Sequence, residues 1–413
     1  MSKWDEKRLE DIIDVDPKMK LNKGTTYPFI DIDQVSPDRI YVTKNEEKVY
    51  TGQSSSKFCN GDTVFSRITP CLENRKIAKV SIDENSAFGS TEFYVFRAKK
   101  DVSDERYVYY LCSSDAVVLP AINSMSGASG RQRADKRYIQ RIKLSVPDLP
   151  TQKKIADILT AYDDLIENNL ARISLLEKMA SELYKEWFVR FRFPRYKTVK
   201  FVDRIPEGWE YVPLKDILTF SRGISYSSEE LTDDVDGHNL INLKNISAYG
   251  GFNHEGTKKY RGDYKESQIV NSGDLVMGIT DMTQDRRTVG SVALIPPLDG
   301  VSVISADLLK INSEIDNIFL YCLCKYGYYS KYFSMFANGA NVLHLRPDML
   351  YSRKILLPPI ELINEFVSLV SPLFDGMNAY HKQNEILIKQ RDLLLPRLMS
   401  GKLSVEPLLS ETA

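Results

Sequence analysis

Apolar and polar residues alternate in short runs along much of the chain, and Gly, Asn, Asp or Pro bound each run. A period of two is typical of β-strands that bury one face. Two other stretches, 107–112 and 318–326, carry apolar residues at helical spacing. The pattern therefore predicts an α+β protein, with strands at 29–35, 63–68, 93–97, 239–246, 275–279 and 306–311.

Two longer segments follow a spacing of alternately four and three residues, one from Ile155 to Trp187 and one from Phe366 to Leu398. Each covers more than four heptads with charged flanks, which is typical of a coiled-coil helix. At 1.5 Å per residue the first helix would be roughly 50 Å long. We expect Pro372 and Pro396 to kink or shorten the second helix.

The chain repeats itself at a nearly constant offset, which is 205 residues for the first pair of matching segments and 211 or 212 for the others. The segment 4–12 shares Trp, Leu, Asp and Ile with 209–217. Further pairs of matching segments follow in the same order: 29–32 with 240–243, 61–64 with 273–276, 104–112 with 316–324, 127–128 with 339–340, and Pro147 with Pro358. These matches predict a tandem duplication of a mixed α/β domain followed by a long helix.

Asn169 is the only strongly polar residue in the first heptad seam, and the second seam carries Asn384. Antiparallel packing with flush ends places these two amides opposite each other. A slip by one heptad would bury both against aliphatic side chains. The amides are thus predicted to set the register, with a pseudo-twofold axis near Ala171 and Lys382. The alternative is that both amides reach solvent.

These patterns divide the chain into two homologous domains and two helices that form an antiparallel coiled coil. The predicted segments are a first domain, a central helix, a linker, a second domain, and a C-terminal helix with its tail, at 1–149, 150–192, 193–208, 209–360 and 361–413.

Composition narrows the class of protein. The 413 residues carry a formal net charge of -1 and five cysteines without zinc-ligand spacing, so we expect reduced thiols in a cytoplasmic protein. The charged N-terminus and the absence of a long apolar stretch predict neither a signal peptide nor a membrane span. The stretches 131–143 and 185–204 are locally basic. A single basic run is more often a solvated surface, but together with the repeat these runs suggest nucleic acid as a partner.

Motifs for catalysis are absent. The chain has no Gly-rich phosphate loop, no S-adenosylmethionine-type turn and no Asn-Pro-Pro-aromatic tetrad, and its four histidines are scattered. We therefore predict no catalytic, cofactor-binding or metal site. One weak alternative is a metal-dependent nuclease, for which Pro37-Asp38 and Glu46-Glu47-Lys48 fit a loose signature. The second copy lacks an equivalent.

DNA contact accounts better for the polar residues. Each copy places small residues before a basic or polar stretch, and Arg and Asn are the residue types that read guanine and adenine edges. The candidates in these loops are Ser126, Ser129, Arg131, Arg133, Lys136 and Arg137 in the first copy and Asn338, Asn341, His344 and Arg346 in the second. A second set of candidates comprises Arg67, Arg75, Lys76, Lys244, Asn245, Arg286 and Arg287.

Several motifs resemble the specificity subunits of Type I restriction–modification enzymes. They are IKLSVP at 142–147, QKKIADIL at 152–159, LLEK at 175–178, WFVRFRFP at 187–194, PEGW at 206–209 and LPRLMSGKL at 395–403. The second copy departs from the family pattern, because Ile363-Asn364-Glu365 stands where the first has Gln152-Lys153-Lys154. The contacts of the two helices with partners could therefore be unequal.

The resemblance implies a non-catalytic subunit without cofactors that recognises double-stranded DNA. Each domain would be a target-recognition domain for one half of a split site, and the helices would set the spacing. Two modification subunits, which methylate adenine, would dock beside the helices, and motor-nuclease subunits would join them. The alternative is a stand-alone bivalent nucleic-acid-binding scaffold with a coiled-coil spacer.

Overall fold

The computed structural model describes residues 4–37, 39–44, 46–128, 130–234 and 236–405. The chain forms two compact units, one of Met1–Leu170 with Lys382–Ala413 and one of Ala171–His381. Each unit thus contains one α/β domain and a part of each long helix.

The first unit is built on strands β1 (Trp4–Arg8), β2 (Ile13–Val15), β3 (Thr26–Ile30), β4 (Tyr41–Val42), β5 (Glu46–Val49), β6 (Ser56–Phe58), β7 (Thr63–Ser66), β8 (Ile77–Val80), β9 (Ala87–Gly89), β10 (Phe93–Ala98) and β11 (Lys143–Pro147). Its short helices are α1 (Leu9–Ile12), α2 (Glu105–Ser113), α3 (Asp115–Asn123) and α4 (Lys136–Gln140). One sheet has the order β2-β10-β7-β8-β4, another has the order β5-β3-β9-β6, and β1 pairs with β11.

The second unit contains β12 (Phe201–Val202), β13 (Ile205–Pro206), β14 (Glu210–Pro213), β15 (Leu218–Arg222), β16 (Leu231–Thr232), β17 (His238–Ile241), β18 (Lys258–Tyr260), β19 (Ile269–Val270), β20 (Leu275–Gly278), β21 (Thr280–Asp281), β22 (Val292–Leu294), β23 (Ser302–Ile304), β24 (Leu308–Ser313), β25 (Leu343–His344) and β26 (Lys354–Leu357). Its short helices are α6 (Asn317–Tyr326), α7 (Tyr329–Ser334) and α8 (Asp348–Tyr351). The larger sheets have the orders β15-β24-β20-β22 and β16-β18-β17-β23-β19.

The two units share one topology, as the sequence repeat predicts. The ribbon β1·β11 corresponds to β14·β26, and the order β2-β10-β7-β8 corresponds to β15-β24-β20-β22. The parallel pair β3·β9 corresponds to β17·β23. Equivalent aspartates, Asp104 and Asp316, cap the N-termini of α2 and α6. The tandem repeat of mixed α/β domains is therefore confirmed.

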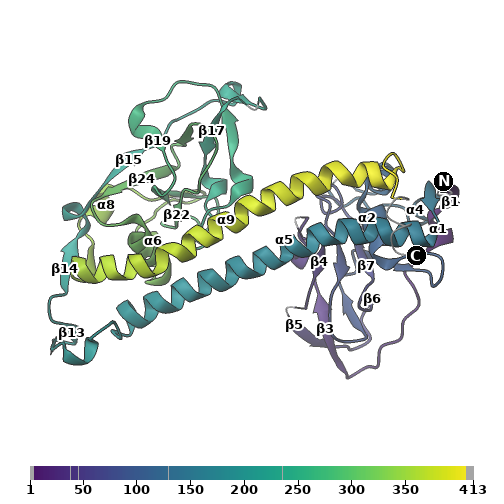
Figure 1. Ribbon diagram of the computed structural model, residues 1–413, viewed down its shortest axis with the longest axis horizontal. Helices are drawn as coiled ribbons and strands as arrows, with labels where there is room; N and C mark the ends of the chain where they lie inside the picture. Colours follow the sequence, from purple (N-terminus) through teal and green to yellow (C-terminus); the bar gives the residue numbers. More distant parts are fainter. Residues whose placement is uncertain (1–3, 38, 45, 129, 235, 406–413) are drawn as a thin grey trace. The chain divides into compact units, whose positions relative to one another are not determined.

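The long helices are α5 (Leu149–Tyr184), which continues into a π-helical turn at Lys185–Val189, and α9 (Ile360–Met399) (Figure 1). Within each unit the two helices run antiparallel. In the first unit Ile155 and Leu398 belong to one buried cluster. In the second unit the ring centroids of Trp187 and Phe366 lie 5.6 Å apart.

The prediction that Pro372 and Pro396 shorten the second helix is wrong. The helix continues through Pro372 and Pro396 to Met399. Both prolines are exposed, so water can satisfy the carbonyl group that each leaves without its helical donor. Two predicted strands, 29–35 and 239–246, also extend beyond the observed strands, which end at Ile30 and Ile241. Residues 32–34 and 243–245 form 3-10 turns, because the side chains of Asp31 and Asn242 cap the backbone there.

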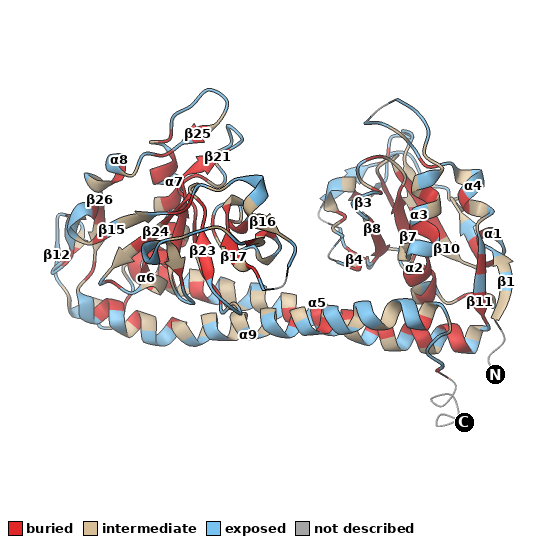
Figure 2. Ribbon diagram, turned by 90° about the horizontal axis from the view of Figure 1, so that it is seen from above, coloured by how far each residue is buried: buried red, intermediate tan, exposed pale blue. Residues whose placement is uncertain are grey.

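Buried apolar residues hold each unit together (Figure 2). In the first unit, both large sheets contribute to one cluster that includes Ile30, Phe58 and Val95. In the second unit, α6 packs on the sheet through Phe319, Leu320 and Leu323.

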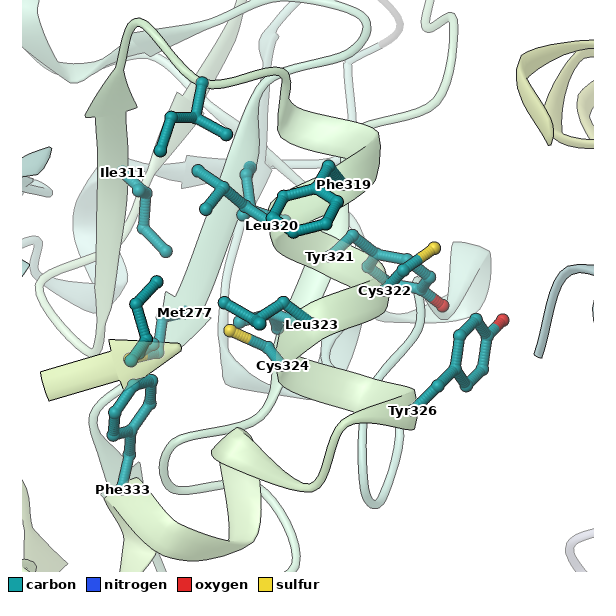
Figure 3. Close-up of a cluster of buried hydrophobic side chains, with 14 of the residues drawn as sticks. Met277, Ile311, Phe319, Leu320, Tyr321, Cys322, Leu323, Cys324, Tyr326 and Phe333 are labelled. Carbon is teal, nitrogen blue, oxygen red and sulfur yellow. The ribbon is translucent and has the colours of Figure 1, made fainter. Parts of the chain in front are cut away.

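Cys322 and Cys324 lie in this second core. Figure 3 shows the sulfur of Cys324 on the side of Met277 and Phe333. Burial raises the pKa of the Cys324 thiol to about 12, so the thiol stays protonated at neutral pH.

Candidate nucleic-acid interface

In the first unit, the two sets of candidate residues come together through backbone hydrogen bonds. Ser126 and Arg133 exchange backbone N–H···O bonds of 3.1 and 3.0 Å. The backbone N–H of Ala134 donates to the carbonyl of Arg67 at 2.8 Å. The loop 126–133 therefore lies against the segment that begins at Arg67.

The second unit repeats this construction at the equivalent positions. Asn338 and His344 exchange backbone bonds of 3.0 and 2.9 Å, and the N–H of Leu345 donates to the carbonyl of Ile279 at 2.8 Å. Strands β21 and β25 pair antiparallel, with Thr280 opposite His344. We call each of these paired structures a loop cluster, comprising 67–76 with 126–137 in the first unit and 279–288 with 338–346 in the second.

The side chains of the first loop cluster are partly neutralised by carboxylates that the sequence did not single out. Arg133 donates to both carboxylate oxygens of Glu92, at 2.9 and 2.6 Å, and Arg67 donates to the same group at 3.4 Å. The hydrogen bonds from Arg133 hold the pKa of Glu92 below its usual value. Lys136 pairs with Asp16 at 2.8 Å. Glu92 thus fixes the direction of two candidate guanidinium groups.

Arg75 and Lys76 contact neighbouring protein segments. Arg75 donates to the carbonyl of Ser113 at 3.2 Å and pairs with Asp115. Lys76 donates to the carbonyl of Ile32 at 3.1 Å. These contacts tie the first loop cluster to the α2–α3 connection and to the turn after β3.

An anchored carboxylate organises the second loop cluster. Asp281 is buried, and it accepts hydrogen bonds from the backbone N–H groups of Thr283 and Thr288, both at 2.8 Å. Burial by itself would raise the pKa of Asp281, but these hydrogen bonds outweigh it and lower the pKa to about 2. The Gln284 side chain donates to the carbonyl of Ala340 at 2.9 Å, and this bond joins the two loops.

Arg286 and Arg287 differ in their surroundings. Arg286 donates to the carbonyl of Ser334 at 2.8 Å, whereas Arg287 is exposed and pairs with the nearby Asp285 at 2.7 Å. The remaining candidates that are exposed are Ser126, Arg131, Arg137, Lys244, Asn338, Asn341, His344 and Arg346. Ser129 lies outside the described residues.

Asn245 does not fit the predicted role of a DNA contact, because its side chain is fully buried. Its amide donates to the carbonyl of Asn253 at 2.9 Å and to the hydroxyl of Thr257 at 2.8 Å, and it accepts from the N–H of Asn242. All of its hydrogen-bonding groups are occupied, so it stabilises a loop and cannot read a base. The sequence around Asn245 does not indicate this burial, since Asn residues are usually exposed.

The nuclease pattern gains no support. Glu46, Glu47 and Lys48 lie on the exposed strand β5, where Lys48 pairs with Glu46 at 2.9 Å and its ammonium lies 3.6 Å from the Phe29 ring centroid. Asp38 lies outside the described residues. Among the residues that the structure describes, no three His, Cys, Asp or Glu side chains are grouped to hold a metal ion.

Three polar helix residues that the sequence singled out, Asn169, Asn384 and Gln152, are buried. Asn169 and Asn384 lie in the first unit, and the Asn169 amide donates to the Asn384 carbonyl oxygen at 2.8 Å. Gln152 is fully buried as well. It accepts from the N–H of Asp104 at 3.1 Å and donates to the carbonyl of Pro147 at 2.9 Å. Gln152 therefore fixes the start of α5 against the domain.

Comparison with known proteins agrees with this construction. A family model described as Type I restriction modification DNA specificity domain matches residues 1–178. The Type I restriction enzyme MjaIX specificity subunit of Methanocaldococcus jannaschii is 27% identical, over 98% of this chain and 94% of that protein. The HindI specificity subunit of Haemophilus influenzae is 25% identical, over 98% of this chain and 100% of that protein.

Over nearly its whole length the chain is similar to specificity subunits of Type I restriction enzymes. A solved S subunit of a Type I restriction–modification system from M. genitalium shares its fold, with a TM-score of 0.55 at 15% identity over 96% of each chain. The specificity subunit is the DNA-recognition component and not a catalytic one. A stand-alone scaffold is not favoured, because these relatives are subunits of larger enzymes. Across the described residues, every helix is too short or too polar to cross a lipid bilayer.

Proposed function

We propose that this specificity subunit reads a split DNA site in the cytoplasm, with the loop cluster of each unit on one half. The observation that carries the proposal is the repeated construction of the two loop clusters. The same backbone hydrogen bonds recur in both units, while the side chains they carry differ, with Arg133 in one and His344 in the other. A constant scaffold with variable side chains suits two readers of different sequences.

The chemistry of each loop cluster fits different parts of DNA. Arg131 and Arg137 are exposed, and guanidinium groups of this kind bind phosphates or guanine edges. Asn338 and Asn341 are exposed amides, which can pair with adenine. Arg133 is held by Glu92, so its contacts would be fixed in direction before DNA arrives.

The long helices are proposed to set the spacing between the half-sites and to carry two modification subunits, which motor-nuclease subunits join. An unpaired helix flank supports the docking role. In the first unit Leu165, Ile386 and Leu393 are exposed. When the heptads are counted from the seam residues Asn169 and Asn384, these three apolar residues fall on the same flank of the helix pair. The other flank faces the unit's own domain, because Asp163 accepts a hydrogen bond from Tyr110 there.

The second unit has a corresponding flank, with Leu175, Met179 and Leu369 exposed. Its opposite flank packs on the domain, since the ring of Phe374 on α9 lies 5.6 Å from that of Tyr321. Exposed apolar side chains at such positions are typical of a surface that another helix covers. One flank in each unit fits one modification subunit for each unit.

A domain exchange tests the split reading. Residues 20–145 are replaced with those of another specificity subunit, and the methylated adenines of the host genome are sequenced. One half of the methylated motif should change, while the other half and the spacer length stay the same. The proposal fails if both halves change together, or if the original motif persists.

A further inference from the structure

The loop that follows β21 in the second loop cluster begins with an exposed apolar residue. Met282 follows β21 directly, and 70% of its surface is exposed, the largest fraction among the exposed large hydrophobic residues of the described chain. The next three residues, Thr283, Gln284 and Asp285, are polar and exposed. An apolar side chain in this setting has nothing within its own loop to pack on.

The loop that bears Met282 is held in place from both ends. Asp281 accepts hydrogen bonds from the backbone N–H groups of Thr283 and Thr288, and the hydroxyl of Thr288 donates to the carbonyl of Thr280 at 3.1 Å. Gln284 is bonded to the facing loop at Ala340. Because the backbone is already ordered, a contact through Met282 costs little further conformational entropy.

The neighbours of Met282 suggest what it contacts. Its loop cluster presents Asn338, Asn341 and His344, whose side chains are exposed and of the kind that bonds to base edges in the major groove. The thymine C5 methyl group is the apolar feature of that groove. The Met side chain is unbranched and polarisable, so it adapts to a small apolar group.

We propose that Met282 is a specificity-determining residue that packs on the methyl group of a thymine in the half-site read by the second unit. The inference rests on the proposed function and names one chemical group that its second loop cluster recognises. The first unit has a counterpart, because Pro70 occupies the position equivalent to Met282 and is also exposed. Both loop clusters thus place an exposed apolar residue at equivalent positions.

The test uses the assembled complex of the specificity and modification subunits and duplexes that carry the methylated site. The half-site read by the second unit is the one that stays unchanged when residues 20–145 are exchanged. Each thymine of this half-site is replaced, one at a time, by uracil, which lacks the methyl group. One replacement should weaken binding of the unaltered complex about fourfold, the factor expected for one buried methyl group. In M282A that penalty should disappear, while M282L should retain it.

Met335 provides a matched control, since it is also a methionine of the second unit and is 66% exposed, but on the residue after α7. M335A should keep the uracil penalty. The inference is overturned if M282A keeps the penalty, or if no thymine shows one. Failure of the proposed function looks different, because the unaltered complex would then show no preference for a split site at all.

Discussion

The side-chain amide of Asn169 donates a hydrogen bond of 2.8 Å to the amide oxygen of Asn384, and both residues are buried between α5 and α9 in the first unit. Asn384 donates in turn to the carbonyl of Ile166 at 3.3 Å, and Asn169 donates also to Gln383 at 3.0 Å. A buried amide is costly without partners, so the pair favours the one register in which both amides are satisfied.

Replacement of one amide should destabilise the first unit. N169L leaves the Asn384 oxygen without the Asn169 donor in a buried site, and the expected loss in the free energy of unfolding is about 1–3 kcal/mol. Urea denaturation measures it. N168L is the matched control, because Asn168 is the neighbouring residue and is exposed. A loss of similar size in N168L would contradict the role of the pair.

The double variant N169L/N384L separates stability from register. Two leucines remove both unsatisfied amides, so the double variant should be more stable than N169L alone. It should also lose the preference for one register. Cysteine pairs introduced at opposed and at slipped positions of the two helices would report this, since both should then form disulfides. Crosslinking in a single register would show that other contacts choose it.

The exposed helix flank can be tested with a charge. L393E places a carboxylate on a residue that is 64% exposed, so the chain itself should keep its melting temperature. Association with the modification subunit should weaken at least tenfold in a pull-down or calorimetric titration, because a charge would be buried at the interface. L119E, on the exposed side of α3, serves as the control and should leave association unchanged.

The basic residues of the first loop cluster predict a particular salt dependence. Arg131 and Arg137 are exposed, and R131A or R137A should weaken binding to all sequences if the residue binds a phosphate group. The slope of log K against log salt should fall by about 0.9 for each phosphate that the variant no longer neutralises. Lys143 pairs with Glu6 on the β1·β11 ribbon, so K143A should leave the slope as it is. An unchanged slope in both arginine variants would exclude phosphate binding at these positions.

The pKa of Asp281 predicts how the second loop cluster responds to acid. Its folded-state value of about 2 lies below the ordinary 3.8, so the charged form stabilises the folded loop. This contribution is complete above about pH 4 and is lost as the pH falls towards 2. The stability difference between the unaltered chain and D281N should therefore be constant from pH 5 to 7 and shrink below pH 4. Urea midpoints across this range measure it, and a difference as large at pH 2 as at pH 7 would contradict the prediction.

The repeat, the two helices and their heptad seam could be predicted from the sequence alone. Each depends on a local or periodic pattern, such as the three- and four-residue spacing from Ile155 to Trp187 or the matched capping aspartates Asp104 and Asp316. Patterns of this kind survive without knowledge of the fold, because neighbours along a helix are also neighbours in the sequence.

Only the tertiary structure decided whether each candidate side chain is buried, hydrogen-bonded or ion-paired. Asn245 and Asn341 look alike in the sequence, yet the first is buried and fully hydrogen-bonded and the second is exposed. Glu92 pairs with Arg133 from 41 residues away, and no short pattern announces that pairing. Burial and ion pairing depend on groups that the fold brings together from distant parts of the chain. The loop clusters therefore form only when the segment around Arg67 packs beside that around Arg133, and the segment around Asp281 beside that around His344.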